Sequence, residues 1–321
     1  MPYLIGTDEA GYSPHLGPLV ISAAVFWVAD LDAGEDLYPR LKKVICRKPS
    51  RSSAAPRLAI GDSKALYSPA LGLAQLERGV LAALALVNRA PADWLDVWSM
   101  LDPGAIERLP AMPWHVGYDL RLALAADADE LERRLPRWRR DLDAAGVRLV
   151  ALKSRALFPD EFNRINDLLG NKSETLSQTT LGLLADVLAG CEDEPVLVVC
   201  DKHGGRNAYG RLLQQQFPDP LIEVRRESGP ESVYRWQRGT ATVEARFRVG
   251  GEEFLPTALA SMASKYLREL SMRAFNDFWC GRVQDLSPTA GYSKDAWRFR
   301  SQVEQVQTAL GIDDGIMWRS R

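Results

Sequence analysis

The beginning of the chain constrains its fold more than any other segment. Residues 3–8 and 19–28 are apolar runs separated by turn-forming residues that include Gly11, and this pattern predicts a β-hairpin. The first run ends in two adjacent carboxylates, Asp8 and Glu9. Successive side chains of a strand point to opposite faces, so these two reach a common cation only if the strand ends there and the chain turns. Gly11 permits that turn, and an acidic hairpin tip without further role is the alternative.

The composition is typical of a soluble globular protein and excludes several classes. The formal net charge of the 321 residues is −2, so binding to nucleic acid requires a local basic patch. No apolar run is long enough to span a membrane, and the N-terminus lacks a signal-peptide pattern, so we expect a cytoplasmic protein without membrane partners. The cysteines show no metal-binding spacing, which favours reduced structural thiols at Cys46, Cys191, Cys200 and Cys280.

Strands and helices alternate along the rest of the chain. Apolar runs predict strands at 147–152, 196–200 and 221–224. Leucine and alanine at helical spacing predict a helix over 70–88, and an apolar stripe predicts another over 257–275. This alternation predicts an α/β protein.

Two segments interrupt the pattern. Residues 32–57 are rich in arginine and lysine and predict a loop with a helical start, which either contacts phosphates or is simply solvated. Residues 95–146 are broken by prolines and contain a predicted exposed helix over 131–142. We expect one domain over 1–321, with the second segment as an insertion of unknown role.

Five short motifs, in order along the chain, resemble motifs of ribonucleases HII and HIII. They are Thr7-Asp8-Glu9-Ala10-Gly11 with Gly17-Pro18, Gly61-Asp62-Ser63-Lys64, residues 196–201, residues 260–269, and Gly291-Tyr292-Ser293-Lys294. Each motif alone is weak, but five in the right order are specific. The resemblance implies a ribonuclease H-like five-stranded mixed sheet that starts with an antiparallel meander and is flanked by helices. It also implies a monomeric two-metal-ion endonuclease that uses Mg²⁺ or Mn²⁺ to hydrolyse RNA in RNA–DNA hybrids.

Carboxylates are the ligands that this chemistry requires, because hard divalent cations prefer oxygen. Two such ions activate the attacking water and stabilise the leaving oxygen of a phosphodiester. The resemblance implies that Asp8, Glu9, Asp201 and Glu269 bind the metals and are catalytic. The family has aspartate where this chain has Glu269, which borders the apolar stripe of its predicted helix.

The resemblance also implies residues that contact nucleic acid. The segment Gly11-Tyr12-Ser13 corresponds to the Gly-Arg-Gly with which ribonucleases HII read a 2′-hydroxyl. The ring of Tyr12 either stacks on the substrate or packs on a neighbouring loop. The lysines Lys64 and Lys265 match phosphate-contacting positions, and Tyr292 matches a tyrosine that stacks on a sugar.

Two further segments have a nucleic-acid interpretation from composition alone. Arg206 lies in a glycine-containing loop over 202–207 that is either a phosphate cradle or a flexible turn. Residues 297–300 interleave aromatic and basic side chains, which is compatible with a nucleic-acid edge.

An alternative function has the same fold. A catalytically impaired or differently specific nucleic-acid-binding protein would explain the departures at Tyr12, Ser13 and Glu269. A small-molecule enzyme is disfavoured, because no nucleotide-binding loop follows a predicted strand.

Overall fold

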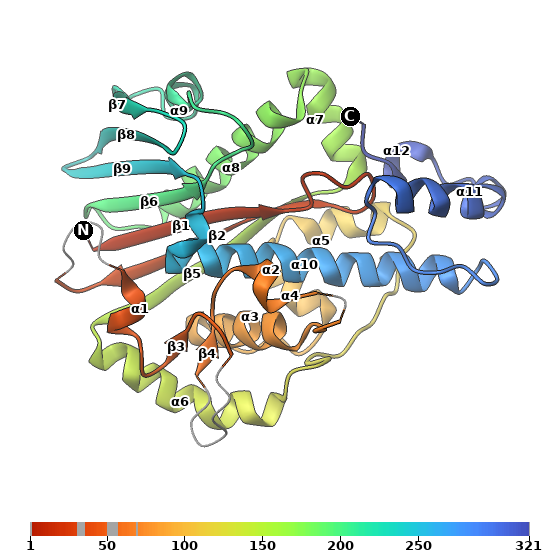
Figure 1. The fold of residues 1–321 in the computed structure, drawn as a ribbon, viewed down its shortest axis with the longest axis horizontal. Coiled ribbons are helices and arrows are strands. Elements are labelled where there is room, and N and C mark those ends of the chain that lie inside the picture. Colours follow the sequence, from red (N-terminus) through yellow and green to blue (C-terminus); the bar gives the residue numbers. More distant parts are fainter. Residues whose placement is uncertain (1, 31–35, 50–56, 69, 321) are drawn as a thin grey trace.

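A seven-stranded mixed sheet runs through the protein (Figure 1). The structure is a computed structural model and describes residues 2–30, 36–49, 57–68 and 70–320. In spatial order the strands are β5 (Val147–Leu157), β2 (Leu19–Val28), β1 (Tyr3–Ala10), β6 (Val196–Asp201), β9 (Ala241–Arg248), β8 (Glu231–Arg238) and β7 (Glu223–Glu227). A separate parallel pair consists of β3 (Ile45–Cys46) and β4 (Leu58–Ala59).

The first five strands of this order confirm the predicted ribonuclease H-like fold class. β2 pairs antiparallel with both β1 and β5, and β6 is parallel to both β1 and β9. β8 and β7 extend the sheet antiparallel beyond β9, so the sheet has seven strands instead of the predicted five. The runs 231–238 and 241–248 were not predicted as strands, because charged side chains alternate with their buried ones.

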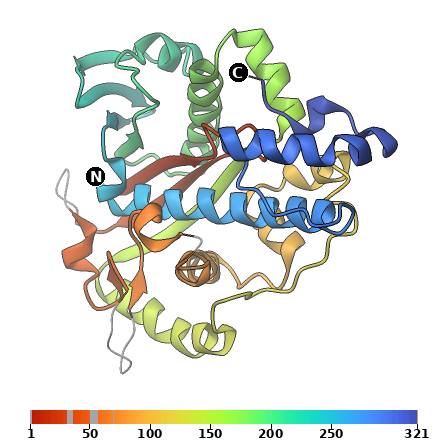
Figure 2. The ribbon, with the colours of Figure 1, turned by 45° about the vertical axis from the view of Figure 1, so that its right-hand side comes forward.

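Helices cover both faces of the sheet (Figures 1 and 2). β1 alternates between two hydrophobic clusters, with Leu4 in one and Ile5 in the other. The cluster around Leu4 is formed with α3 (Ala74–Val87), α6 (Ala128–Ala144) and α10 (Leu255–Cys280), and the cluster around Ile5 with α7 (Pro159–Leu169), α8 (Lys172–Ala189) and α9 (Gly210–Gln216). None of the described helices has the length and apolar character needed to cross a membrane.

The insertion predicted over 95–146 packs against the same core as α10. It contains α4 (Trp94–Leu101), α5 (Ala105–Arg108), the 3₁₀ helix η1 (Leu109–Ala111) and α6. α6 is charged on one face but buries Leu131, Trp138 and Leu142 on the other. The helix predicted as exposed over 131–142 therefore covers the core with its apolar face.

The basic segment is described only in part, because 31–35 and 50–56 lie outside the described residues. Its predicted helical start is the single turn α1 (Leu37–Arg40). The remaining short elements are α2 (Ser63–Leu66), the 3₁₀ helix η2 (Gly251–Glu253), α11 (Ser293–Ala309) and α12 (Asp314–Met317). α11 and α12 lie beside the tip of the loop that joins β1 to β2 (Figures 1 and 2).

Candidate active site

The N-terminal end of α10 fixes the ends of β1 and β6. A Cβ atom on Gly6 would lie 2.0 Å from the backbone nitrogen of Thr257, so glycine is required for this approach of helix to strand. The Thr257 hydroxyl donates to the Val199 carbonyl at 2.8 Å, and the Ser264 hydroxyl donates to the Asp8 carbonyl at 3.0 Å. One long helix, α10, therefore holds the backbone that carries Asp8 in place.

Asp201 ends the strand beside the one that carries Asp8. β1 and β6 are parallel, with Thr7 opposite Cys200, so the two aspartates leave the sheet at the same edge. The Gly251 N–H donates to Asp201 Oδ1 at 2.9 Å, and a Cβ on Gly251 would lie only 3.0 Å from the Asp201 Cα. This close approach lays η2 against the strand end and brings Glu252 to the same place.

These four residues, Asp8, Glu9, Asp201 and Glu252, are here called the strand-end carboxylates. Burial raises the pKa of Asp8 to about 7, to which the charges of Asp201 and Glu252 contribute. Burial and the charges of Asp8 and Asp201 raise the pKa of Glu9 well above its usual value. The pKa of Asp201 is also raised, by burial and by Glu252, while the charge of Lys64 opposes the rise for Glu9 and Asp201.

No ion pair to any strand-end carboxylate is found in the part of the chain that the structure describes. Exposed Lys64 is the cation whose field reaches them. Partly buried like charges without a counter-ion are unfavourable, and a bound divalent cation would relieve the repulsion. An all-carboxylate donor set fits Mg²⁺ or Mn²⁺.

The strand-end carboxylates do not converge on a single point. Among the described residues, no three His, Cys, Asp or Glu side chains are spaced to hold one ion. The Glu9 N–H donates to Asp8 Oδ1 at 2.8 Å, and the two side chains leave a strand in alternate directions. Mg²⁺ usually keeps several of its waters, so ligation by one or two carboxylates is compatible with this arrangement.

Glu269 differs from the other three predicted metal ligands because it has ion-pair partners of its own. Its carboxylate accepts a hydrogen bond from the Tyr67 hydroxyl at 2.6 Å and pairs with Lys265 Nζ at 2.7 Å and Arg268 Nη1 at 3.7 Å. We call these four residues the Glu269 network. Cations of its own helix thus already balance the charge of Glu269, and a tyrosine of the loop after α2 donates a hydrogen bond to it.

Sequence reasoning missed Glu252, although a signal for it exists. Two glycines precede the acidic pair Glu252-Glu253, and a proline and a long helix follow it. The sequence analysis sought the fourth ligand inside that helix, whereas the structure places a carboxylate in the short turn before it.

The loop after Glu9 is held by a buried arginine. Gly11 has a φ of +88°, as the predicted turn requires, and a Cβ there would lie 2.7 Å from Arg268 Nε. Arg268 is 1% exposed and donates to the carbonyls of Leu16 at 3.3 Å and Ala290 at 2.9 Å. One side chain therefore joins the β1–β2 loop to the segment before Tyr292.

The two residues that replace the family's Arg-Gly have different environments. Tyr12 is partly buried and packs against the hydrophobic cluster of α8 and α9, whereas Ser13 is exposed. Burial and the charge of Glu9 raise the pKa of Tyr12, and Arg206 opposes this rise. Of the two alternatives for Tyr12, packing on the protein is the one that the structure shows.

The basic residues predicted to contact nucleic acid differ in whether they already have an acidic partner. Lys265 is bound in the Glu269 network and lies 4.9 Å from the Tyr67 ring centroid. Arg206 donates to Glu174 at 2.9 Å and to Ser173 at 3.2 Å. Lys64, in contrast, is exposed beside the strand-end carboxylates.

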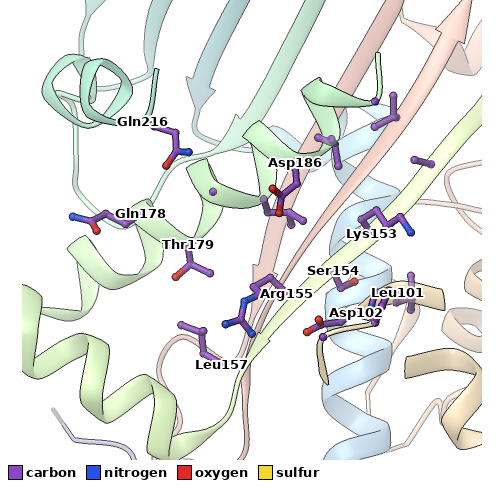
Figure 3. A pocket seen from close by; sticks show the side chains of 18 of the residues that line it. Leu101, Asp102, Lys153, Ser154, Arg155, Leu157, Gln178, Thr179, Asp186 and Gln216 are labelled. Carbon is purple, nitrogen blue, oxygen red and sulfur yellow. The ribbon is translucent and has the colours of Figure 1, made fainter. Parts of the chain in front are cut away.

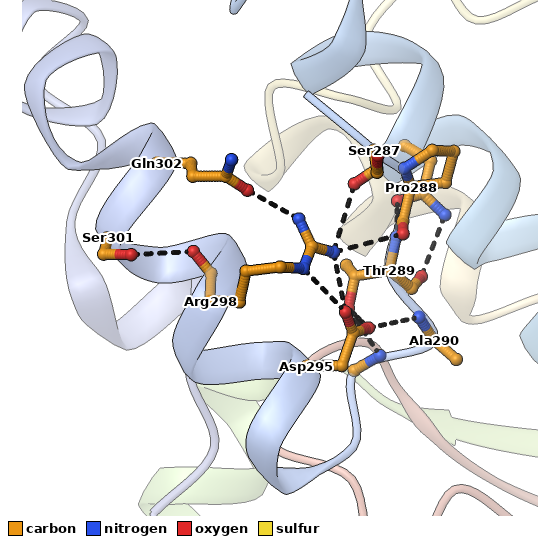
Figure 4. A network of polar contacts seen from close by, with 10 residues as sticks. Ser287, Pro288, Thr289, Ala290, Asp295, Arg298, Ser301 and Gln302 are labelled. Atoms are coloured by element: carbon orange, nitrogen blue, oxygen red, sulfur yellow. Dashed lines mark hydrogen bonds and ion pairs between the residues drawn. The ribbon is translucent and has the colours of Figure 1, made fainter. Parts of the chain in front are cut away.

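The aromatic and basic residues 297–300 also divide. Arg298 donates to Asp295 and to the carbonyls of Ser287 and Pro288, which closes the loop before α11 (Figure 4). Phe299 is fully buried. Trp297 and Arg300 remain at the surface and are considered below.

A pocket of about 980 Å³ lies elsewhere in the described residues. It opens between the outer edge of β5 and α8, and Lys153, Arg155 and Thr179 are among its polar lining (Figure 3). None of the strand-end carboxylates lines it. Its size therefore gives no reason to place the chemistry there.

Comparison with known proteins gives structural similarity at low sequence identity. No protein-family model matches the chain, and no curated protein sequence does. RNase HII from Archaeoglobus fulgidus, solved in a PCNA complex, is 14% identical over 99% of this chain and 94% of its own, with a TM-score of 0.42. Ribonuclease H2 from Pyrococcus horikoshii OT3 is 15% identical over 98% and 92%, with a TM-score of 0.44. Bst-RNase HIII, solved with Mn²⁺, is 15% identical over 99% and 65%, with a TM-score of 0.40.

These solved structures are ribonucleases HII and HIII, the family that the sequence motifs resemble. Similarity at this level concerns the path of the chain and assigns no residue a role.

Proposed function

We propose that this protein is a metal-dependent endonuclease that hydrolyses the RNA strand of RNA–DNA hybrids. The observation that carries the proposal is the group of strand-end carboxylates, which lie together at one edge of the sheet without an ion pair among the described residues. Asp8, Glu9, Asp201 and Glu252 would hold the divalent cations. When bound, two such ions supply an activated water and stabilise the leaving oxygen.

The remaining residues of the site would position the substrate. Lys64 offers an exposed ammonium group to a phosphate next to the carboxylates. Tyr292 is 47% exposed and its ring lies 5.7 Å from Arg268 Cζ, which fixes it beside the β1–β2 loop. An exposed, braced tyrosine suits stacking on a ribose or base.

The same loop determines which ribonucleotides are accepted. Ser13 stands where the family has a glycine that lets the backbone approach a 2′-hydroxyl closely, and Tyr12 is turned toward the protein. We therefore expect better cleavage of long hybrid tracts than of a single ribonucleotide in duplex DNA, since a hybrid is recognised by shape and phosphate contacts. The double substitution Tyr12→Arg with Ser13→Gly should raise single-ribonucleotide cleavage more than hybrid cleavage.

A second candidate is a nucleic-acid-binding protein of the same fold with little or no catalysis. The separation of the carboxylates and the altered loop at Tyr12 and Ser13 favour it. Metal titration distinguishes the two functions. A ligand that binds the folded state raises the melting temperature, so an active site should be stabilised by Mg²⁺ or Mn²⁺ in the millimolar range and cleave in the same buffer. An unchanged melting temperature in both metals would favour the second candidate.

A further inference from the structure

One large aromatic ring is left exposed beside the candidate site. Trp297, on the second turn of α11, is 51% exposed. One face of its indole stacks on Trp318, with ring centroids 5.6 Å apart and planes inclined by 21°. Arg300 Cζ lies 5.6 Å from the Trp297 centroid and 4.9 Å from that of Trp318. The exposed area of Trp297 therefore belongs to a ring that is already supported from one side.

The lower ring of this stack is fixed firmly to the protein. Trp318 is 8% exposed and bridges to Leu16 in antiparallel fashion, and its carbonyl accepts from Asn163 Nδ2 at 2.7 Å. The next residue, Arg319, donates its N–H to the His15 carbonyl at 2.9 Å. These contacts attach Trp318 to the β1–β2 loop, so Trp297 stacks on a ring that is held in place.

The stack is next to the loop that begins at the strand-end carboxylates. The His15 ring is centred 6.1 Å from Trp297 and 6.3 Å from Trp318. His15 belongs to the loop that follows Glu9 and Gly11, and Tyr292 caps the start of the helix that carries Trp297. Two exposed aromatic rings, Tyr292 and Trp297, therefore lie at the start of α11, which packs beside this loop (Figure 2).

We propose that Trp297, Trp318 and Arg300 form a stacking platform for an unpaired nucleobase of the substrate. The inference rests on the proposed function and extends it from the scissile bond to the single strand that leaves the hybrid. Bases inside a duplex are stacked on one another, so only an unpaired base offers a free π-face to Trp297. Arg300 lies beside both rings and pairs with Asp314 at 2.6 Å, so it supports the stack through cation–π contacts.

The test compares two fluorescent substrates with the full-length protein. One is a blunt RNA–DNA hybrid, and the other is the same hybrid with a single-stranded tail, placed at either end in separate experiments. Anisotropy titrations use Ca²⁺ in place of Mg²⁺ to hold the substrate uncleaved. We expect the wild type to bind one tailed hybrid more tightly than the blunt one. We expect Trp297→Ala to lose about tenfold in affinity for that tailed hybrid and little for the blunt one, since base–aromatic stacking is typically of this size.

Three variants separate stacking from a general structural effect. Trp297→Phe keeps a ring and should retain most of the preference for the tail. Arg300→Gln should weaken tailed binding less than Trp297→Ala, because Arg300 is paired with Asp314 and acts only through the two rings. Leu310→Ala truncates a side chain that is 48% exposed at the other end of α11 and should bind both substrates like the wild type.

Two outcomes would count against the platform, and they are distinguishable. Wild-type binding to the hybrid without any gain from a tail, or equal losses for both substrates in Trp297→Ala, would overturn this inference and leave the proposed function standing. Failure of the wild type to bind any hybrid would remove the proposed function and the platform with it.

Discussion

The strand-end carboxylates and the Glu269 network differ in how their negative charge is balanced. The strand-end carboxylates sit together without an ion pair among the described residues, and burial and mutual repulsion raise the pKa values of Asp8, Glu9 and Asp201. Glu269 lies in a motif that resembles one with a metal ligand in the family. Lys265 and Arg268 already balance its negative charge, and the Tyr67 hydroxyl donates a hydrogen bond to it. A bound metal ion stabilises a carboxylate little when neighbouring cations already balance its charge, and stabilises an unpaired carboxylate strongly. Local charge balance therefore indicates the metal ligands better than position in a motif.

The largest expected effect is on cleavage by Asp201→Asn compared with Glu269→Gln. Loss of a ligand that supports several kcal/mol of transition-state stabilisation should lower single-turnover cleavage of a hybrid by about 10³-fold or more. Glu269→Gln should retain activity within about tenfold, because it removes a structural partner. Equal losses in the two variants would erase the distinction between the groups.

A neighbouring pair of glutamates tests whether Glu252 is the fourth ligand. Glu252→Gln should reduce cleavage and Mg²⁺ affinity by about 10- to 100-fold, the range typical of altered metal-site residues. Glu253 is the matched control, since it is the next residue and its side chain is 77% exposed and, among the described residues, forms one long ion pair of 3.8 Å with Arg248. Glu253→Gln should behave like the wild type, and a comparable loss there would point to η2 as a whole instead of to one ligand.

The sequence predicted the fold more completely than it predicted the candidate site. Strands β1, β2 and β6 were predictable because most of their positions are apolar and buried. Strand β9 was not predicted because the charged residues Glu244, Arg246 and Arg248 interrupt its apolar positions. The turn at Gly11, where φ is positive, was predicted from the position of this glycine just after Asp8 and Glu9.

The local pattern around Glu252 does not by itself place this residue beside Asp201. Its position depends on the contact between Gly251 and the backbone of Asp201, residues that are fifty positions apart. In the same way, the pairing of Glu269 depends on Tyr67, which a distant loop supplies. Both are tertiary contacts, and helix spacing carries no information about them.

Stability of the metal-free protein should change with opposite sign in the two groups. Asp8→Asn removes one of several mutually repelling charges and should raise the free energy of unfolding by about 1 kcal/mol or more. Glu269→Leu leaves Lys265 and the buried Arg268 without their carboxylate and should lower it by about 1–3 kcal/mol. Urea unfolding in a chelating buffer measures both, and destabilisation by Asp8→Asn would argue against unrelieved repulsion.

The pH dependence of stability gives a further effect that is diagnostic of Asp8. A carboxyl group whose pKa is raised in the folded state favours folding when protonated, so its contribution is lost as the pH rises from the unfolded value toward the folded one. The pKa of Asp8 is raised to about 7. The metal-free protein should therefore lose stability between about pH 4 and pH 7, by at most about 1.4 kcal/mol per pH unit for this group.

Saturating Mg²⁺ and Asp8→Asn should each flatten this pH profile, while Glu269→Gln should leave it unchanged. Unfolding curves recorded at pH 5 and pH 8 with and without Mg²⁺ are sufficient. A profile of the same slope with and without the metal would mean that the ion does not meet the charge of Asp8.

The most direct test of the central claim is cleavage of a substrate panel by the wild type and Asp201→Asn. The panel contains a uniform RNA–DNA hybrid, duplex DNA with one ribonucleotide, duplex RNA and duplex DNA, each in Mg²⁺ and in Mn²⁺. We predict that the wild type cuts the RNA strand of the uniform hybrid best, cuts the single-ribonucleotide duplex poorly, leaves duplex DNA intact, and loses all cleavage in Asp201→Asn. Absence of cleavage of every substrate in both metals by folded wild-type protein, or unchanged hybrid cleavage by Asp201→Asn, would contradict the assignment of the strand-end carboxylates as the catalytic metal ligands.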